Sequence, residues 1–189
     1  MGMGSTKEVV SVGTLRALLL GQYRAGYAML KDAVGRFPAD AWWGDGHDNA
    51  PWQIAYHVLY YTHLYLQPRL EDFQPWPGHQ AEAAYEDGIA GEPVDGSDVP
   101  LIPEPYSKEQ VLAYLAWCEG RLDGWLDALD LTSAESGFRW YPLSKLEHQV
   151  INVRHLHHHM AQLADRLRAA GGGGVRWVST VRAGWPVGE

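Results

Sequence analysis

Apolar residues recur at spacings of three and four along four stretches of the chain, a pattern typical of amphipathic helices. The first stretch covers about residues 14–35 and ends at Phe37-Pro38, because the residue before a proline avoids the helical region. Its apolar face consists of Leu15, Leu18, Leu19, Tyr23, Tyr27, Leu30 and Val34. We therefore expect a long first helix with one buried face.

The second predicted helix covers about residues 50–72. Asn49 is a suitable N-cap, and Pro51 is tolerated in the first turn. Pro68 should bend or loosen the last turn, because proline has no backbone N–H to donate. This helix is rich in aromatic residues: Trp52, Tyr56, Tyr60, Tyr61 and Tyr65.

Two further helices begin at capping boxes, in which a serine is followed three residues later by Gln or Glu. Ser107 and Gln110 open a helix predicted to reach about residue 130. Ser144 and Glu147 open the last one, which is predicted to reach about residue 170 before the glycines at 171–174.

Residues 73–106 contain six prolines, and long connections of this kind are often lids or binding loops. A plain crossover strap between helices two and three, or a strap that also covers a site, would both fit. The tail at 171–189 holds a β-like run at 175–181, which predicts either a hairpin or an extended arm packed on the helices.

These elements predict an all-α fold: a four-helix bundle with a long crossover between helices two and three and a short C-terminal extension. The chain of 189 residues suits a single domain, with the bundle at about 14–170 and an irregular tail after it. Bundles of this kind build metal sites from side chains that face inward on neighbouring helices.

Composition limits the kind of partner. The net charge is −8, and no Lys/Arg cluster is present that would neutralise phosphates or bind an anionic membrane surface. A small-molecule substrate is the expected partner, and a homodimer stays open. No apolar stretch approaches the roughly 20 residues of a membrane span, and no signal peptide is recognisable. With one cysteine, Cys118, these features predict a cytoplasmic protein.

The run from Arg154 to Gln162 carries the strongest chemical signal. His155 and His159 are four residues apart, so on a helix they lie one above the other and present two imidazoles to one point. Imidazole is a common ligand of zinc, nickel, copper and iron. His158 is rotated by about 100° from His159 and cannot easily replace either member of the pair.

A third ligand is expected from a facing helix, and the second helix offers His57 and His63. They are about 240° apart around an ideal helix, so both cannot face one ion. His57 is preferred because it lies mid-helix. His47 and His79 fall in predicted loops and are weaker candidates.

Three further residues lie close to this predicted site. His148 precedes His155 by seven residues and so shares its face, as a fourth ligand or as a hydrogen-bond partner of a ligand. Tyr61 lies one turn from His57, and Asn152 lies near the His155 line. Tyr61 could line a substrate cavity, although a place in the core is favoured for most aromatic residues of this helix. Asn152 could position a ligand, and a buried structural amide explains it equally well.

The arrangement resembles the DinB/YfiT-like superfamily of metal-dependent four-helix-bundle proteins, in which one His of the second helix joins a His-x-x-x-His pair in the last. The segment at 52–57, ending in His57, resembles the first motif, and the segment at 155–163 resembles the second. The resemblance covers about residues 14–170. Many members have Arg-Gly after the last His, where this chain has Met160-Ala161.

Three His ligands leave a coordination position open, as catalytic sites require. The resemblance implies thiol-dependent S-transfer or isomerisation with a low-molecular-weight thiol, or metal-assisted hydrolysis, with one divalent ion such as Zn, Ni or Fe. A non-catalytic module that binds metal or a small ligand is the alternative, and histidines that only pack in a core would need no metal at all.

Overall fold

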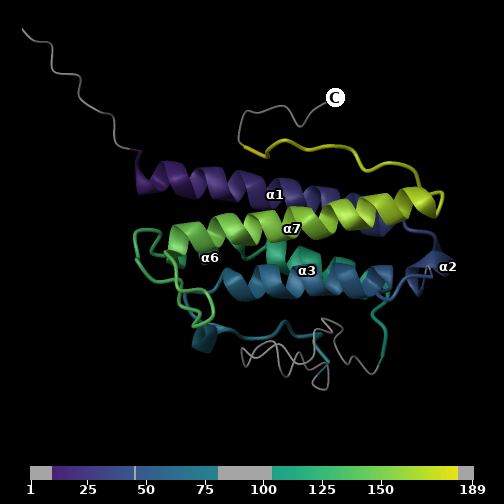
Figure 1. Cartoon of the computed structure of the whole chain (residues 1–189), viewed down its shortest axis with the longest axis horizontal. Helices are drawn as coiled ribbons and strands as arrows, with labels where there is room; N and C mark the ends of the chain where they lie inside the picture. Colours follow the sequence, from purple (N-terminus) through teal and green to yellow (C-terminus); the bar gives the residue numbers. More distant parts are fainter. Residues whose placement is uncertain (1–9, 45, 81–103, 183–189) are drawn as a thin grey trace, which may run out of the picture.

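A computed structural model describes residues 10–44, 46–80 and 104–182, and in these ranges the chain is helical without any strand. Figure 1 shows the elements in order. They are α1 (Val12–Arg36), α2 (Ala39–Trp42), α3 (Pro51–Tyr65), the 3-10 turn η1 (Leu70–Asp72), α5 (Lys108–Glu119), α6 (Leu122–Ala128) and α7 (Lys145–Ala169). The all-α prediction is therefore confirmed for the described residues.

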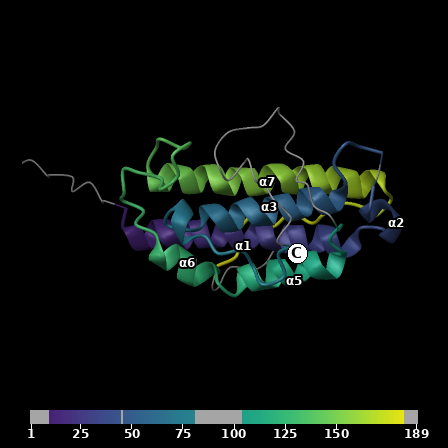
Figure 2. The same cartoon turned by 90° about the horizontal axis from the view of Figure 1, so that it is seen from below.

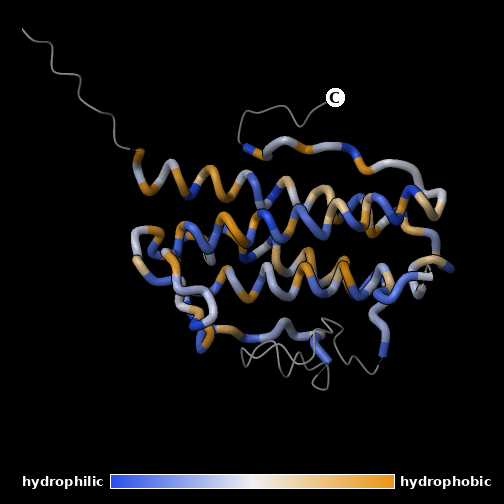
Figure 3. The backbone as a smooth tube through the Cα atoms, in the orientation of Figure 1, coloured by the Kyte–Doolittle hydropathy of each residue, from blue (hydrophilic) through white to orange (hydrophobic). Residues whose placement is uncertain are grey.

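The helices pack lengthwise against one another. α7 lies between α1 and α3 and contacts both, as Figure 1 shows. α5 contacts the same two helices from the other side, and α6 continues along α1 (Figure 2). Figure 3 shows polar and apolar positions alternating along each helix, which is the pattern that predicted them. None of the described helices has the length and apolarity needed to cross a membrane.

The predicted ends of the first two helices shift by a few residues. α1 begins earlier than expected because the Ser11 hydroxyl caps it, accepting the Thr14 N–H. α3 begins after Ala50 and not after Asn49. Its first turn is closed by the Gln53 side chain, which accepts the Ala50 N–H at 2.7 Å. The expected Asn49 cap is therefore wrong.

Two predicted helices are shorter than expected. The second ends at Tyr65, and η1 is a separate turn, because Pro68 cannot continue the backbone ladder. The third divides into α5 and α6 at Gly120 and Arg121, where glycine weakens the helix interior. The capping boxes fare better: Ser107 and Gln110 form both bonds, and Ser144 accepts the Glu147 N–H.

The described part of the tail is an extended arm and not a hairpin. It runs along α1 on the outside of the molecule (Figure 1). The Val181 N–H donates to the Gly21 carbonyl at 3.2 Å, and the Gln22 side chain donates to Ser179 at 3.3 Å. A side chain at Gly21 would collide with Thr180, so this glycine permits the close approach of the arm.

The connection between helices two and three is described only at its two ends. Phe73 packs on Tyr60, and Trp76 stacks on Tyr114, so the first end covers the groove between α3 and α5. Tyr106, at the second end, stacks on Tyr56. The prediction of a strap that also covers a site concerns residues 81–103, which lie outside the described ranges.

Candidate metal centre

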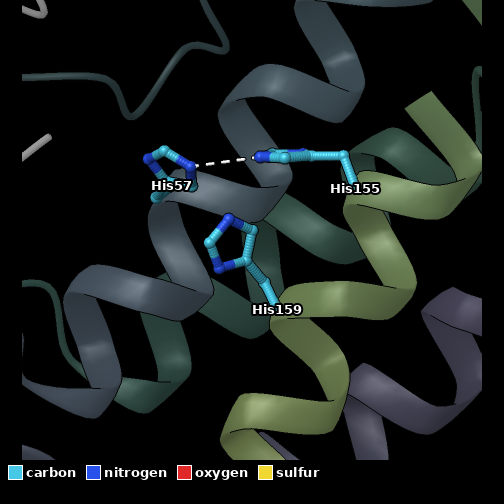
Figure 4. Close-up of side chains that lie close together, drawn as sticks. All are labelled: His57, His155 and His159. Carbon is cyan, nitrogen blue, oxygen red and sulfur yellow. Dashed lines mark hydrogen bonds between the residues drawn. The ribbon is translucent and has the colours of Figure 1, made fainter. Parts of the chain in front are cut away.

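Three imidazoles meet in the seam between α3 and α7. Figure 4 shows His57 on α3 facing His155 and His159, which project from successive turns of α7. One ring nitrogen from each of the three lies within 4.8 Å of the others. Among the described residues, this is the group of His, Cys, Asp or Glu side chains that could hold a metal ion. The sequence-predicted triad is thus brought together.

The spacing of the ring nitrogens suits a shared ion. The Nε2 atoms of His57 and His155 lie 3.2 Å apart, the contact marked by a dashed line in Figure 4. Two imidazole nitrogens on one tetrahedral zinc ion, each at about 2.0–2.1 Å, would be about 3.3–3.4 Å apart. Without an ion, the same distance corresponds to an ordinary hydrogen bond, in which one ring donates its N–H to the nitrogen of the other. The three-imidazole donor set, and the spacing of the His57–His155 pair, therefore fit a divalent metal.

The site favours neutral imidazoles. Burial lowers the pKa of His155 to about 3, and the neighbouring His159 and His158 add to the shift. Burial also lowers the pKa of His57 well below its usual range, with repulsion from His159 and His155 as the smaller causes. A metal has to compete with protons for imidazole nitrogens. At neutral pH both rings are therefore neutral, which is the protonation state in which imidazole binds a metal.

Gln162 holds the ring of His159. Its Oε1 lies 3.1 Å from the His159 Nδ1 and can accept the Nδ1–H, so that Nε2 is the nitrogen without a proton in the neutral ring. Ligand histidines usually donate their second N–H in this way, which fixes the tautomer and the orientation of the ring. The three-residue spacing from His159 to Gln162 is the sequence signal for this contact, because residues three apart are neighbours on a helix.

The triad opens onto a small cavity of about 140 Å³. His57 and His159 form its inner wall, and His158, which is exposed, lines it from the surface side. The remaining lining residues are neutral: Asn49, Gln53, Ile54 and Gln162. His158 thus lies at the mouth of the site, outside the group of three, as the helix rotation predicted.

The three neighbouring residues from the sequence analysis lie at different places. The Tyr61 ring centroid is 4.7 Å from that of His57 and 5.9 Å from that of His155, so Tyr61 flanks the site. Asn152 is buried one turn below His155 and donates to the Thr62 carbonyl at 3.2 Å. His148 lies further along α7 and is not a member of the group.

His148 instead occupies an aromatic pocket. The rings of Tyr65, Phe138 and Tyr141 surround it, with centroids 4.8–5.0 Å away. Both of its ring nitrogens are buried without a hydrogen-bond partner among the described residues. The pKa of His148 is lowered to about 4, mainly by burial and secondarily by the Lys145 ammonium.

The alternative histidines also lie outside the triad. His63 stacks on Trp125, and its Nδ1 lies 3.0 Å from the Tyr114 hydroxyl. His79 contacts the Tyr56 hydroxyl on the α5 side of α3. His47 is exposed in the loop before α3. The preference for His57 over these three as the partner of the α7 pair agrees with their positions.

We expect His148→Phe to make the free energy of unfolding depend less steeply on pH under acidic conditions. The metal affinity at pH 7.5 should not change. The unfolded chain protonates His148 near its ordinary pKa of about 6.5, whereas the folded protein does so only near pH 4. Between these values the unfolded state binds one proton more, so stability rises with pH. Removing the histidine should lower that slope by up to about 1.4 kcal/mol per pH unit.

Urea denaturation of the metal-free wild type and variant at pH 4.5, 5.5 and 7.5 measures this slope. Equal slopes in the two proteins would contradict the buried, neutral state of His148. A large loss of metal affinity in the variant would instead show that His148 acts on the site.

Comparison with known proteins adds no relative. No family model matches the chain, and neither curated proteins nor solved structures give a match. The DinB-like resemblance therefore rests on the segments around His57 and His155–His159, and the metal site rests on its geometry.

Proposed function

We propose that this protein binds one divalent metal ion through His57, His155 and His159 and uses it in a metal-dependent reaction. The observation that carries the proposal is the meeting of three ring nitrogens within 4.8 Å, from two helices far apart in sequence. The helices α1, α3, α5 with α6, and α7 would be the four members of a DinB/YfiT-like bundle. The contacts of α1 and α3 with both α5 and α7 support that arrangement.

The site has room for a substrate beside the ion. No fourth His, Cys, Asp or Glu among the described residues joins the triad, and the 140 Å³ cavity adjoins two of its three members. A bound divalent ion supplies Lewis acidity, which lowers the pKa of a bound water or thiol. The residues of the chain hold the ion and leave one side accessible, which is the usual arrangement of a catalytic site and not of a structural one.

The cavity suits a small neutral molecule or the reacting end of a larger one. Its described lining carries amides and an imidazole but no carboxylate, lysine or arginine. A low-molecular-weight thiol fits this chemistry, because its sulfur is a good ligand for the metals that imidazole also binds. We therefore propose thiol-dependent S-transfer or isomerisation as the reaction, with metal-assisted hydrolysis as the second enzymatic possibility. Zn, Ni and Fe are all compatible with three imidazoles.

A non-catalytic binding module is the alternative function. The observation that favours it is the scarcity of proton-transfer groups: of the residues that line the cavity beyond the triad, His158 is the titratable one. A protein that stores a metal or sequesters a small ligand needs no such group, whereas hydrolysis usually uses a positioned acid or base.

The test begins with protein purified without nickel resin, whose metal content is measured by mass spectrometry. The metal-free protein is then loaded with Co²⁺ and titrated with 2-mercaptoethanol while the visible and near-ultraviolet spectra are recorded. We expect one Co²⁺ per chain and a new sulfur-to-cobalt charge-transfer band as the thiol enters the open position. His159→Ala serves as the control that lacks the site.

The three outcomes separate the proposals. Absence of stoichiometric cobalt binding would overturn the metal site itself. Cobalt binding with a spectrum that no thiol changes would contradict thiol chemistry. Cobalt binding with a spectrum that neither the thiol nor added azide changes would indicate a closed coordination sphere and favour the non-catalytic module.

A further inference from the structure

The α3–α7 seam remains polar below the triad. His148, Asn152 and His155 follow one another along a single line of α7, at intervals of four and three residues. Thr62 on α3 lies opposite Asn152, and both are fully buried. Polar groups at such positions normally find hydrogen-bond partners, because a buried one without a partner costs about 1–3 kcal/mol.

Three atoms at this level have no partner among the described residues. They are the Asn152 Oδ1, the Thr62 Oγ1 and the His155 Nδ1, and all three are buried. The Asn152 Nδ2 is already used, because it donates to the Thr62 carbonyl at 3.2 Å. The Asn152 side chain also interacts with that of Tyr23, but its Oδ1 accepts no hydrogen bond among the described residues.

His155 needs such an acceptor. Its Nε2 faces His57, so metal binding through Nε2 places the proton of the neutral ring on Nδ1. The two histidines of the α7 pair differ here: His159 has the Gln162 Oε1 at 3.1 Å, whereas the His155 Nδ1 has no partner within the described chain. An orphaned donor on a metal ligand is unusual, since ligand histidines almost always donate their second N–H.

One internal water would satisfy all three atoms. Buried waters typically make about three hydrogen bonds to otherwise unpaired polar groups, and they occur roughly once per 27 residues. A water at this level would accept the His155 Nδ1–H and donate to the Asn152 Oδ1 and the Thr62 Oγ1. Asn152 lies one turn from His155 on the same face of α7, so the two side chains are neighbours on the helix.

We propose that Asn152 is a positioning residue for His155, acting through one internal water that Thr62 also holds. This inference rests on the proposed metal-binding function. Neither Asn152 nor Thr62 would touch the metal or a substrate. Together they would fix the tautomer of His155 and the direction of its Nε2, as Gln162 does for His159.

The test uses the Co²⁺-loaded protein and the variants Asn152→Leu and Thr62→Val, which keep side-chain volume and remove the acceptors. Proton NMR in H₂O detects the N–H of each cobalt-bound imidazole as a strongly shifted signal that disappears in D₂O. We expect the His155 signal, assigned through nuclear Overhauser effects to neighbouring protons of the loaded protein, to broaden through faster exchange in both variants. Zn²⁺ affinity, measured by chelator competition, should fall by about 10- to 100-fold.

Gln162→Leu provides the matched control, because it removes the acceptor of His159 and should affect the other α7 signal. Circular dichroism and urea denaturation of the metal-free variants show whether each is folded, and Thr62→Val carries the test if Asn152→Leu is not. An unchanged His155 signal with unchanged affinity in the folded variants would overturn the proposal. An effect in only one of two folded variants would overturn the shared water. A wild type that binds no cobalt would overturn the metal site instead.

Discussion

His159→Ala is expected to abolish stoichiometric metal binding, whereas His158→Ala is expected to leave it intact. The first change removes one of three ligands and leaves His57 and His155, whose Nε2 atoms are 3.2 Å apart, as a bare pair. We expect affinity to fall by about a thousandfold or more, equivalent to about 4 kcal/mol. The second change removes an exposed ring that lines the cavity without joining the triad.

Competition with a chromophoric chelator measures both affinities on metal-free protein at pH 7.5. The two variants form a matched pair, because the substitutions are adjacent on one helix and alter the same residue type. Urea denaturation without metal checks that both are folded. Equal affinities of the two variants would contradict the assignment of His159 as a ligand, and so would a larger loss in His158→Ala.

The helix period alone predicted most of this site. His155 and His159 share a face because four residues make slightly more than one turn, and His57 was separated from His63 by rotation. Rotation around the helix does not by itself exclude His148 as a ligand. It shares the His155 face, but seven residues correspond to about 10 Å along the axis, too far for a common ion. The sequence predicts the direction in which a helical side chain points. Whether that side chain can contact the metal also depends on the side chains of the facing helix.

Features set by tertiary contacts were predicted less well. The break between α5 and α6 and the path of the tail along α1 depend on packing partners that a local pattern does not contain. The β-like run in the tail has the residues of a strand, but it lies against a helix and finds no neighbouring strand in the described chain. The exact bundle type and the family stay predictions.

We infer that Lys145 helps to set the register between α3 and α7, on which the triad depends. This residue is 3% exposed, and its ammonium donates to carbonyls on both sides of the seam. The Pro68 carbonyl, just beyond the end of α3, is 2.6 Å from Nζ. The Ser136 carbonyl, in the loop that leads into α7, is a second close partner, and the Gln67 carbonyl at 3.4 Å is a third.

Lys145→Met should therefore destabilise the metal-free protein by roughly 3 kcal/mol. Methionine preserves the apolar stem, but it leaves buried carbonyls without the donor that joins them, at about 1–3 kcal/mol for each unsatisfied group. Lys108→Met is the control, because Lys108 donates to the Phe37 carbonyl at 2.9 Å in a less buried place. We expect that variant to lose less than about 1 kcal/mol.

Urea denaturation with and without saturating Zn²⁺ distinguishes a general packing defect from a loss of register. A metal that binds only the folded state stabilises it in proportion to the logarithm of its affinity. If Lys145 holds α7 in register with α3, the stabilisation by Zn²⁺ should be smaller in Lys145→Met than in the wild type. An equal increment in both would mean that the triad keeps its geometry without Lys145. His57 belongs to α3, and His155 and His159 belong to α7. That result would therefore mean that the packing of α3 against α7, and not Lys145, keeps the three histidines together.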